Sequence, residues 1–116
     1  MSDSFIIKIL PEADEFLTYL AEDLVQEGYK IDFHFASKMV DEIIDFIYEL
    51  PNCVHHSIPK EFAYHFERYG TNVQYACFKR KSSPKTTWYI FFEQKGNRFL
   101  VKHISNNWIE GHYLRE

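Results

Sequence analysis

Two pairs of neighbouring residues in the C-terminal part of the chain have side chains suited to proton transfer. They are Lys102-His103 and His112-Tyr113. A histidine titrates close to neutral pH and can donate or accept a proton, while a lysine ammonium can stabilise negative charge that develops nearby. Structural roles remain open for both pairs. His103 alternates with Phe99 and Val101, which is typical of a hydrogen-bonded side chain at the core margin, and His112-Tyr113 can be a frayed tail.

Four cationic side chains cluster on one predicted hairpin and can together bind an anionic group. They are Lys79, Arg80, Lys81 and Lys85. Two large aromatic residues in the neighbouring predicted strands, Tyr75 and Trp88, are available for stacking. The alternative is a solvated hairpin tip, whose lysines keep the edge of a sheet from aggregating.

The charge of the chain is divided strongly between its two halves. Residues 1–58 contain three Lys, no Arg and twelve Asp or Glu, a net charge of −9. Residues 59–116 contain ten Lys or Arg and five Glu, a net charge of +5. This division indicates an anionic partner for the basic half and a basic partner for the acidic half. Two solvated faces that attract each other would give the same pattern.

Metal and nucleotide sites fit the sequence poorly. The segment Cys53–His56 carries one cysteine and two histidines, with His34, His65 and Cys77 as remote candidates. No second closely spaced ligand pair accompanies it, so the spacing is a poor match to a zinc site. The four glycines form no phosphate-binding loop. We therefore predict neither a metal nor a cofactor.

The length and composition predict one folded domain, residues 1–116. The chain has 116 residues, of which 46% are apolar and 18% aromatic, enough to build a packed interior. It has no apolar run as long as a membrane span and no signal-peptide pattern at its start. We expect a cytoplasmic protein with no membrane partner.

The acidic half predicts a strand followed by a helical hairpin. Phe5–Leu10 is a β-branched apolar run, and Pro11 suits the opening of a helix that Gly28 ends. Met39–Leu50 has apolar residues at helical spacing, with Ser37 as its cap. Both helices should pack one apolar stripe onto a sheet.

The basic half predicts the antiparallel sheet. Its strands are Val73–Arg80, Thr86–Glu93 and Arg98–Asn106, with Phe62–Phe66 as a short additional candidate and with turns at Lys81–Lys85 and Gln94–Asn97. The predicted fold class is α+β: an N-terminal strand, a helical hairpin and a three- to four-stranded antiparallel sheet packed on the helices. Because both faces of these strands are largely apolar, the sequence leaves open which face is accessible.

The order of these elements and their residue types resemble the RelE/ParE toxin superfamily. The matching stretches are Phe5–Leu24, Ala36–Pro51 and Tyr75–Asn107. Members are commonly the toxins of toxin–antitoxin pairs, of which many cut messenger RNA on the ribosome and others inhibit gyrase. The resemblance implies a RelE-like fold, an antitoxin protein as partner, and a ribosome-dependent mRNA endoribonuclease that needs no metal.

The resemblance also implies roles for the candidate residues. RNA-cutting members drive a 2′-hydroxyl onto its neighbouring phosphate, which requires a base, an acid and nearby cations. By position, the catalytic groups would be Lys102, His103, His112 and Tyr113. RNA phosphates and bases would be bound by Lys79, Arg80, Lys81, Lys85, Tyr75 and Trp88.

Three departures from the family pattern favour a non-catalytic protein-interaction module of the same fold. Thr87 and Trp88 stand where catalytic members usually place an arginine, and the last predicted strand closes on Asn106-Asn107 instead of a His-Tyr pair. The sequence pI of about 5.8 is lower than expected for a protein that docks on ribosomal RNA. Endoribonuclease, interaction module and gyrase inhibitor are therefore the three hypotheses.

Overall fold

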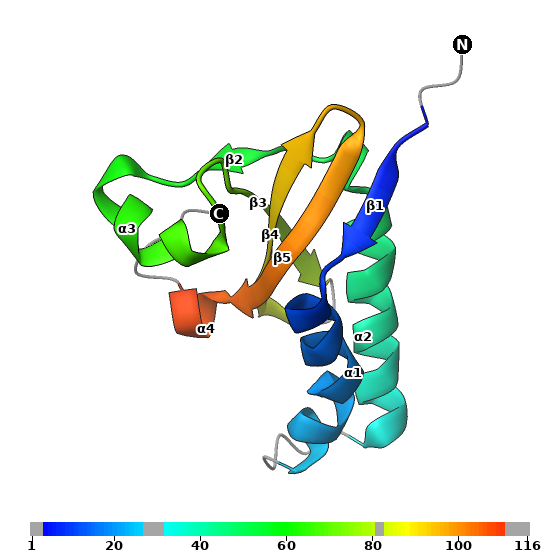
Figure 1. Ribbon diagram of the computed structural model, residues 1–116. Helices are drawn as coiled ribbons and strands as arrows, with labels where there is room; N and C mark the ends of the chain where they lie inside the picture. The colour runs from blue at the N-terminus through cyan, green and yellow to red at the C-terminus, as the bar shows by residue number, and fades with distance from the viewer. Residues whose placement is uncertain (1–3, 27–31, 81–82, 111–116) are drawn as a thin grey trace.

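A five-stranded sheet in the order β1-β5-β4-β3-β2 forms the centre of the computed structural model, which describes residues 4–26, 32–80 and 83–110 (Figure 1). Its strands are β1 (Ile6–Ile9), β2 (His56–Ser57), β3 (Gln74–Arg80), β4 (Ser83–Lys95) and β5 (Arg98–Asn106). β1 runs parallel to β5, and the other pairs are antiparallel. The predicted α+β class is confirmed.

The sheet is larger and more mixed than the three to four antiparallel strands that the sequence predicts. The N-terminal strand joins it in parallel, beside the last strand of the chain, and His56-Ser57 adds a two-residue edge to β3. The predicted bounds of β3 and β5 are confirmed to within one residue. β4 begins at Ser83, which makes the first hairpin connection shorter than predicted.

Two long helices, α1 (Pro11–Gln26) and α2 (Phe33–Tyr48), cover one face of the sheet (Figure 1). α1 opens at Pro11 as predicted, and its predicted end at Gly28 lies outside the described residues. Their buried stripes and the facing sheet residues form the main core, which includes Ala13, Leu17, Leu20, Ala36, Ile43, Ile47, Ile90, Phe92, Phe99 and Val101. None of the described helices is long and apolar enough to cross a membrane.

The predicted start of α2 is wrong by five residues. The helix begins at Phe33, and its N-cap is Asp32, whose Oδ1 accepts a hydrogen bond from the Phe35 N–H at 2.9 Å. Ser37, the predicted cap, lies inside the helix. An aspartate satisfies the free N–H groups of a first turn as well as a serine does, and here it stands earlier in the chain.

The short strand predicted at Phe62–Phe66 is also wrong, because this segment is helical. It consists of η2 (Lys60–Phe62), α3 (Ala63–Phe66) and η3 (Glu67–Tyr69). Phe62, Phe66 and Tyr69 recur at spacings of three and four, which puts them on one side of a helix. That side packs on the face of the sheet opposite α1 and α2 and forms a second core with Tyr75, Tyr89 and Phe91 (Figure 1).

A β-bulge in β5 changes which side chains face each core. Phe91 pairs with His103 and Phe92 pairs with Val101, so Lys102 is an extra residue in β5. Phe99, Val101 and Ile104 all face the helices α1 and α2. Because the bulge breaks the alternation, Lys102 and His103 both lie on the opposite face. The simple alternation of His103 with Phe99 and Val101, assumed from the sequence, is therefore wrong.

Candidate functional site

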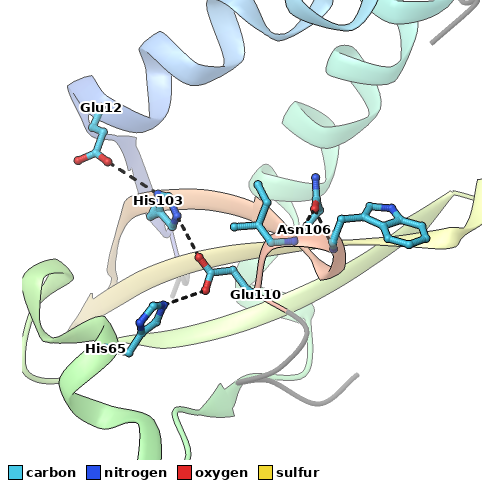
Figure 2. A network of polar contacts seen from close by, with 7 residues as sticks. Glu12, His65, His103, Asn106 and Glu110 are labelled. Atoms are coloured by element: carbon cyan, nitrogen blue, oxygen red, sulfur yellow. Dashed lines mark hydrogen bonds and ion pairs between the residues drawn. The ribbon is translucent and has the colours of Figure 1, made fainter. Parts of the chain in front are cut away.

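Two histidines from distant parts of the chain face one buried carboxylate (Figure 2). Oε2 of Glu110 lies 3.4 Å from Nε2 of His65, and its Oε1 lies 4.0 Å from Nε2 of His103. The side chain of Glu110 is 4% exposed, against 20% for His103 and 30% for His65. We call these three residues the His-Glu cluster. Nδ1 of His103 lies a further 3.8 Å from Oε1 of Glu12 on α1.

Aromatic rings hold the two histidines in place. The ring of Tyr69 stacks on His103 with centroids 4.4 Å apart and planes 12° apart, and Phe91 packs against His103 at 5.4 Å. His65 meets Phe66 edge to face at 4.7 Å, and Phe66 in turn stacks on Phe91 at 5.2 Å. The second core therefore positions both imidazoles.

Asn106 and Asn107 position the carboxylate. Glu110 is the last residue of α4 (Asn107–Glu110), which follows β5 directly. Oδ1 of Asn106 accepts hydrogen bonds from the N–H groups of Trp108, at 3.0 Å, and Ile109, at 3.3 Å (Figure 2). Asn107 binds β4, since its Oδ1 accepts from the Thr87 N–H at 2.8 Å. The asparagine pair that departs from the toxin pattern thus fixes the turn that carries Glu110.

Burial makes His103 a weakly basic imidazole. It lowers the pKa of His103 from 6.5 to about 4, and the positive charge of Arg68 acts in the same direction. The guanidinium carbon of Arg68 lies 4.8 Å from the centre of the Tyr69 ring, which stacks on His103. His103 is consequently uncharged at neutral pH. A base or acid works best when its pKa is near the working pH, so His103 is poorly suited to proton transfer at neutral pH.

The stability of the fold is expected to fall between pH 7 and pH 5. His103 gains its proton near pH 6.5 when unfolded and only near pH 4 when folded, so the unfolded state binds more protons in this window. The stabilisation is complete above pH 6.5, and about 2 kcal/mol is lost by pH 5. Urea unfolding at several pH values measures this. A His103→Gln variant cannot titrate, and it contradicts the prediction if its stability falls as steeply as that of the wild type.

Lys102, a predicted catalytic residue, is bound to a buried carboxylate. Its Nζ lies 3.1 Å from Oε1 of Glu93, and the Asn72 N–H donates to Oε2 of Glu93 at 3.4 Å. Burial favours a higher pKa for Glu93, but the hydrogen bonds from Lys102 and Asn72 outweigh it and the pKa is lowered. Gly70 leaves room for this carboxylate, because its φ is +134° and a Cβ at this position would lie 2.5 Å from Oε2 of Glu93. Lys102 therefore acts here as an ion-pair partner.

The predicted phosphate-binding cations are divided between the two faces of the sheet. Nη2 of Arg80 lies 2.7 Å from Oε2 of Glu42, on the side of α2. Lys79 and Lys85 are exposed, and they stand at strand positions whose side chains point to the face of the sheet opposite α2. Lys81 lies outside the described residues. Two of the four cations, Lys79 and Lys85, are thus accessible on one face.

The predicted stacking residues are not part of this arrangement. Tyr75 and Trp88 are buried, the first against Tyr89 and the second against Phe16, so neither ring is open to a base. His112 and Tyr113 lie outside the described residues. Of the four predicted catalytic residues, His103 belongs to the His-Glu cluster.

As parts of this site, sequence reasoning missed His65, Arg68, Tyr69 and Glu110, although it considered His65 as a remote metal ligand. A signal for the first three was present, because His65, Arg68 and Tyr69 stand at positions i, i+3 and i+4, which lie on one side of a helix. Interpreting the preceding residues as a strand concealed it. Glu110 gave no signal, since a single glutamate near the end of a chain is expected to be solvated.

Residues 53–56, considered as metal ligands, make local contacts. Sγ of Cys53 donates to the Glu49 carbonyl at 3.1 Å, and Nε2 of His55 lies 2.7 Å from the Leu50 carbonyl oxygen. Within residues 4–26, 32–80 and 83–110, no group of three or more His, Cys, Asp or Glu side chains is arranged to hold a metal ion.

Comparisons of the chain with protein-family models, with curated proteins and with solved structures each give no match.

Proposed function

We propose that this protein is a toxin-like endoribonuclease that cleaves single-stranded RNA by acid–base catalysis at the His-Glu cluster. The observation that carries the proposal is the convergence of His65 and His103 on the buried carboxylate of Glu110. The imidazole of His65 beside this carboxylate can supply and remove protons, which is what RNA cleavage by its own 2′-hydroxyl requires.

The reaction needs three functions, and residues around the cluster can provide them. A base removes the proton of the 2′-hydroxyl, whose oxygen attacks the adjacent phosphorus; an acid protonates the departing 5′-oxygen, leaving a 2′,3′-cyclic phosphate and a 5′-hydroxyl. His65 can exchange these protons while Glu110 orients its ring. The exposed guanidinium of Arg68 can stabilise the negative charge that builds up on the phosphate.

The resemblance to the RelE/ParE superfamily supports the same function. It makes messenger RNA on the ribosome the expected substrate and an antitoxin protein the expected partner. The site proposed here differs from the one expected from that resemblance, because it draws on the helical segment of residues 60–69 as well as on β5. His103 has a positioning role in this proposal, since it is uncharged at neutral pH and stacked on Tyr69.

The proposal is tested by inducing the protein in growing bacteria and by incubating the purified protein with RNA in the presence of EDTA. We expect growth arrest, cleaved transcripts and fragments ending in 2′,3′-cyclic phosphate. His65→Ala should abolish both effects, because it removes the acid–base group. His56→Ala is the matched control, since His56 stacks on Tyr75 at the other edge of the sheet. Unimpaired growth together with intact RNA would exclude the function.

A second candidate function, a non-catalytic protein-interaction module, is favoured by the cavity next to His103. This cavity of about 320 Å³ lies along α1 and is lined by Glu12, Ala13, Glu15, Phe16, Tyr19, Asp23, His103 and Ile104. Its carboxylates repel phosphate and attract a basic partner. Such a module would form a stable complex with a protein and cleave no RNA under any condition.

A further inference from the structure

The strand β5 extends beyond the end of its neighbour β1 (Figure 1). The pairing of these two strands ends at Ile9 and Val101, and the Leu10 N–H donates a last hydrogen bond to the Val101 carbonyl at 2.9 Å. Pro11 then begins α1. In the described part of the chain, residues 103–106 of β5 therefore pair with a strand on one side only, which is β4. The open side of such a strand can accept another extended segment.

A cavity lies against this open edge. It has a volume of about 320 Å³ and is lined by His103 and Ile104 of β5 and by one side of α1. Ile104 belongs to the main core, whereas the ring of His103 stacks on Tyr69 on the opposite face of the sheet. Because residues that point to opposite faces line the same cavity, the cavity lies at the edge of β5 and not on either face.

The side of α1 that lines the cavity is acidic and aromatic. Its residues recur at spacings of three and four, which places them along one side of the helix. They are Glu12, Glu15, Phe16, Tyr19 and Asp23. Among the residues that the structure describes, neither a lysine nor an arginine lines the cavity. Tyr19 is half exposed, and the face of an aromatic ring attracts cations.

His103 does not offset the negative charge of this cavity. Its Nδ1 lies 3.8 Å from Oε1 of Glu12, while Glu110 faces Nε2 on the other side of the ring (Figure 2). Burial holds the pKa of His103 at about 4, so the ring is uncharged at neutral pH. A positively charged occupant is therefore favoured over a neutral or an anionic one.

We propose that this edge binds an extended, basic segment of a partner protein, which adds a strand to β5 beyond β1 and places lysine or arginine side chains against α1. Hydrogen bonds to the edge provide affinity, and the three carboxylates select basic side chains. The excess of carboxylates in residues 1–58 steers such a segment towards the cavity. This inference rests on the interaction candidate proposed above, to which it gives a partner chemistry, and it does not depend on RNA cleavage.

The test is binding of a hexapeptide of alternating arginine and valine to the whole chain, measured by isothermal titration calorimetry. In a strand, this peptide carries all its arginines on one face. We expect Glu15→Gln combined with Asp23→Asn to weaken binding on the order of tenfold, because two carboxylates leave the cavity. Glu22→Gln combined with Asp41→Asn is the matched control and should bind as the wild type does, since it removes the same charge from exposed positions outside the cavity.

Strand addition also has readouts that electrostatic attraction alone does not change. The same peptide methylated at every backbone nitrogen keeps its charge but cannot donate hydrogen bonds to the edge, and we expect it not to bind. In nitrogen-15 NMR spectra of the protein, the backbone N–H signals of residues 103–106 should shift when the unmethylated peptide binds. Those of β2, at the other edge of the sheet, should keep their positions.

Several outcomes would overturn this docking site. They are equal binding of a hexapeptide of alternating glutamate and valine, wild-type affinity in the variant that lacks Glu15 and Asp23, or equal binding of the methylated peptide. Spermidine that binds as tightly as the peptide would assign the cavity to a small polycation. Absence of peptide binding in a chain that still forms a stable complex with a protein would remove this docking site and leave the interaction candidate standing.

Discussion

Replacing Glu110 with glutamine is expected to reduce the rate of RNA cleavage by about 10²–10⁴-fold while leaving the fold at least as stable as the wild type. Glutamine keeps the shape of the side chain but cannot pair with an imidazolium at His65. Within the described part of the chain, Oε2 of Glu110 accepts no hydrogen bond, so a neutral amide is easier to bury than the carboxylate. Initial rates and thermal unfolding measure the two effects.

Glu93→Gln is the matched control for this variant, because Glu93 is also a buried glutamate. Its carboxylate is bound by Lys102 at 3.1 Å and by the Asn72 N–H, and it has no part in the proposed reaction. We expect the opposite result from it: a loss of about 1.5–3 kcal/mol in the free energy of unfolding and a cleavage rate close to that of the wild type. A wild-type rate in Glu110→Gln would show that the His-Glu cluster is not catalytic.

Replacing Phe91 with alanine is expected to lower the free energy of unfolding by about 3–5 kcal/mol and also to reduce cleavage by the molecules that remain folded. Phe91 is fully buried. The centroid of its ring lies 5.2 Å from that of Phe66, 6.2 Å from that of Tyr69 and 5.4 Å from that of His103. Removing its ring leaves a cavity beneath the segment that carries His65. Urea unfolding and the cleavage rate, corrected for the folded fraction at low temperature, measure both effects.

Phe92→Ala separates stability from the arrangement of the site. Phe92 is equally buried but faces the main core. The centroid of its ring lies 5.6 Å from that of Phe99 and 4.9 Å from that of His55. It should lose a similar amount of stability and keep its rate per folded molecule. Equal rates in the folded fractions of the two variants would mean that the second core does not position the site. Phe91→Leu provides a milder version if Phe91→Ala does not fold.

The regular elements of this fold could be predicted because their patterns are local. Pro11 marks the first helix, and the aromatic and β-branched runs mark β3, β4 and β5. The parallel pairing of β1 with β5 could not be predicted, since it joins residues at opposite ends of the chain, such as Ile6 and Arg98. The helical segment at Ala63–Phe66 was missed because a short apolar run fits a strand as well as one helical turn.

The candidate site was predictable only in part, for a physical reason. A histidine in a strand can be recognised as a candidate, and His103 was. Its partners His65 and Glu110 come from elements that meet it only through tertiary packing. The accessibility of aromatic residues was also hidden, because Trp88 and Trp108 look alike in the sequence while one is buried and the other exposed. Such differences depend on the bulge and on the order of the strands.

The bulge at Lys102 also has an evolutionary consequence. Deleting that single residue would restore regular pairing between β4 and β5, and all residues before the gap would keep their faces. The residues after it would also keep their faces, because Val101 faces the helices and His103, which would then follow it directly, already lies on the opposite face. In a lineage of such chains, loss of that one codon would remove the ion pair with Glu93 and leave both the imidazole and the carboxylate on the surface that carries Tyr69.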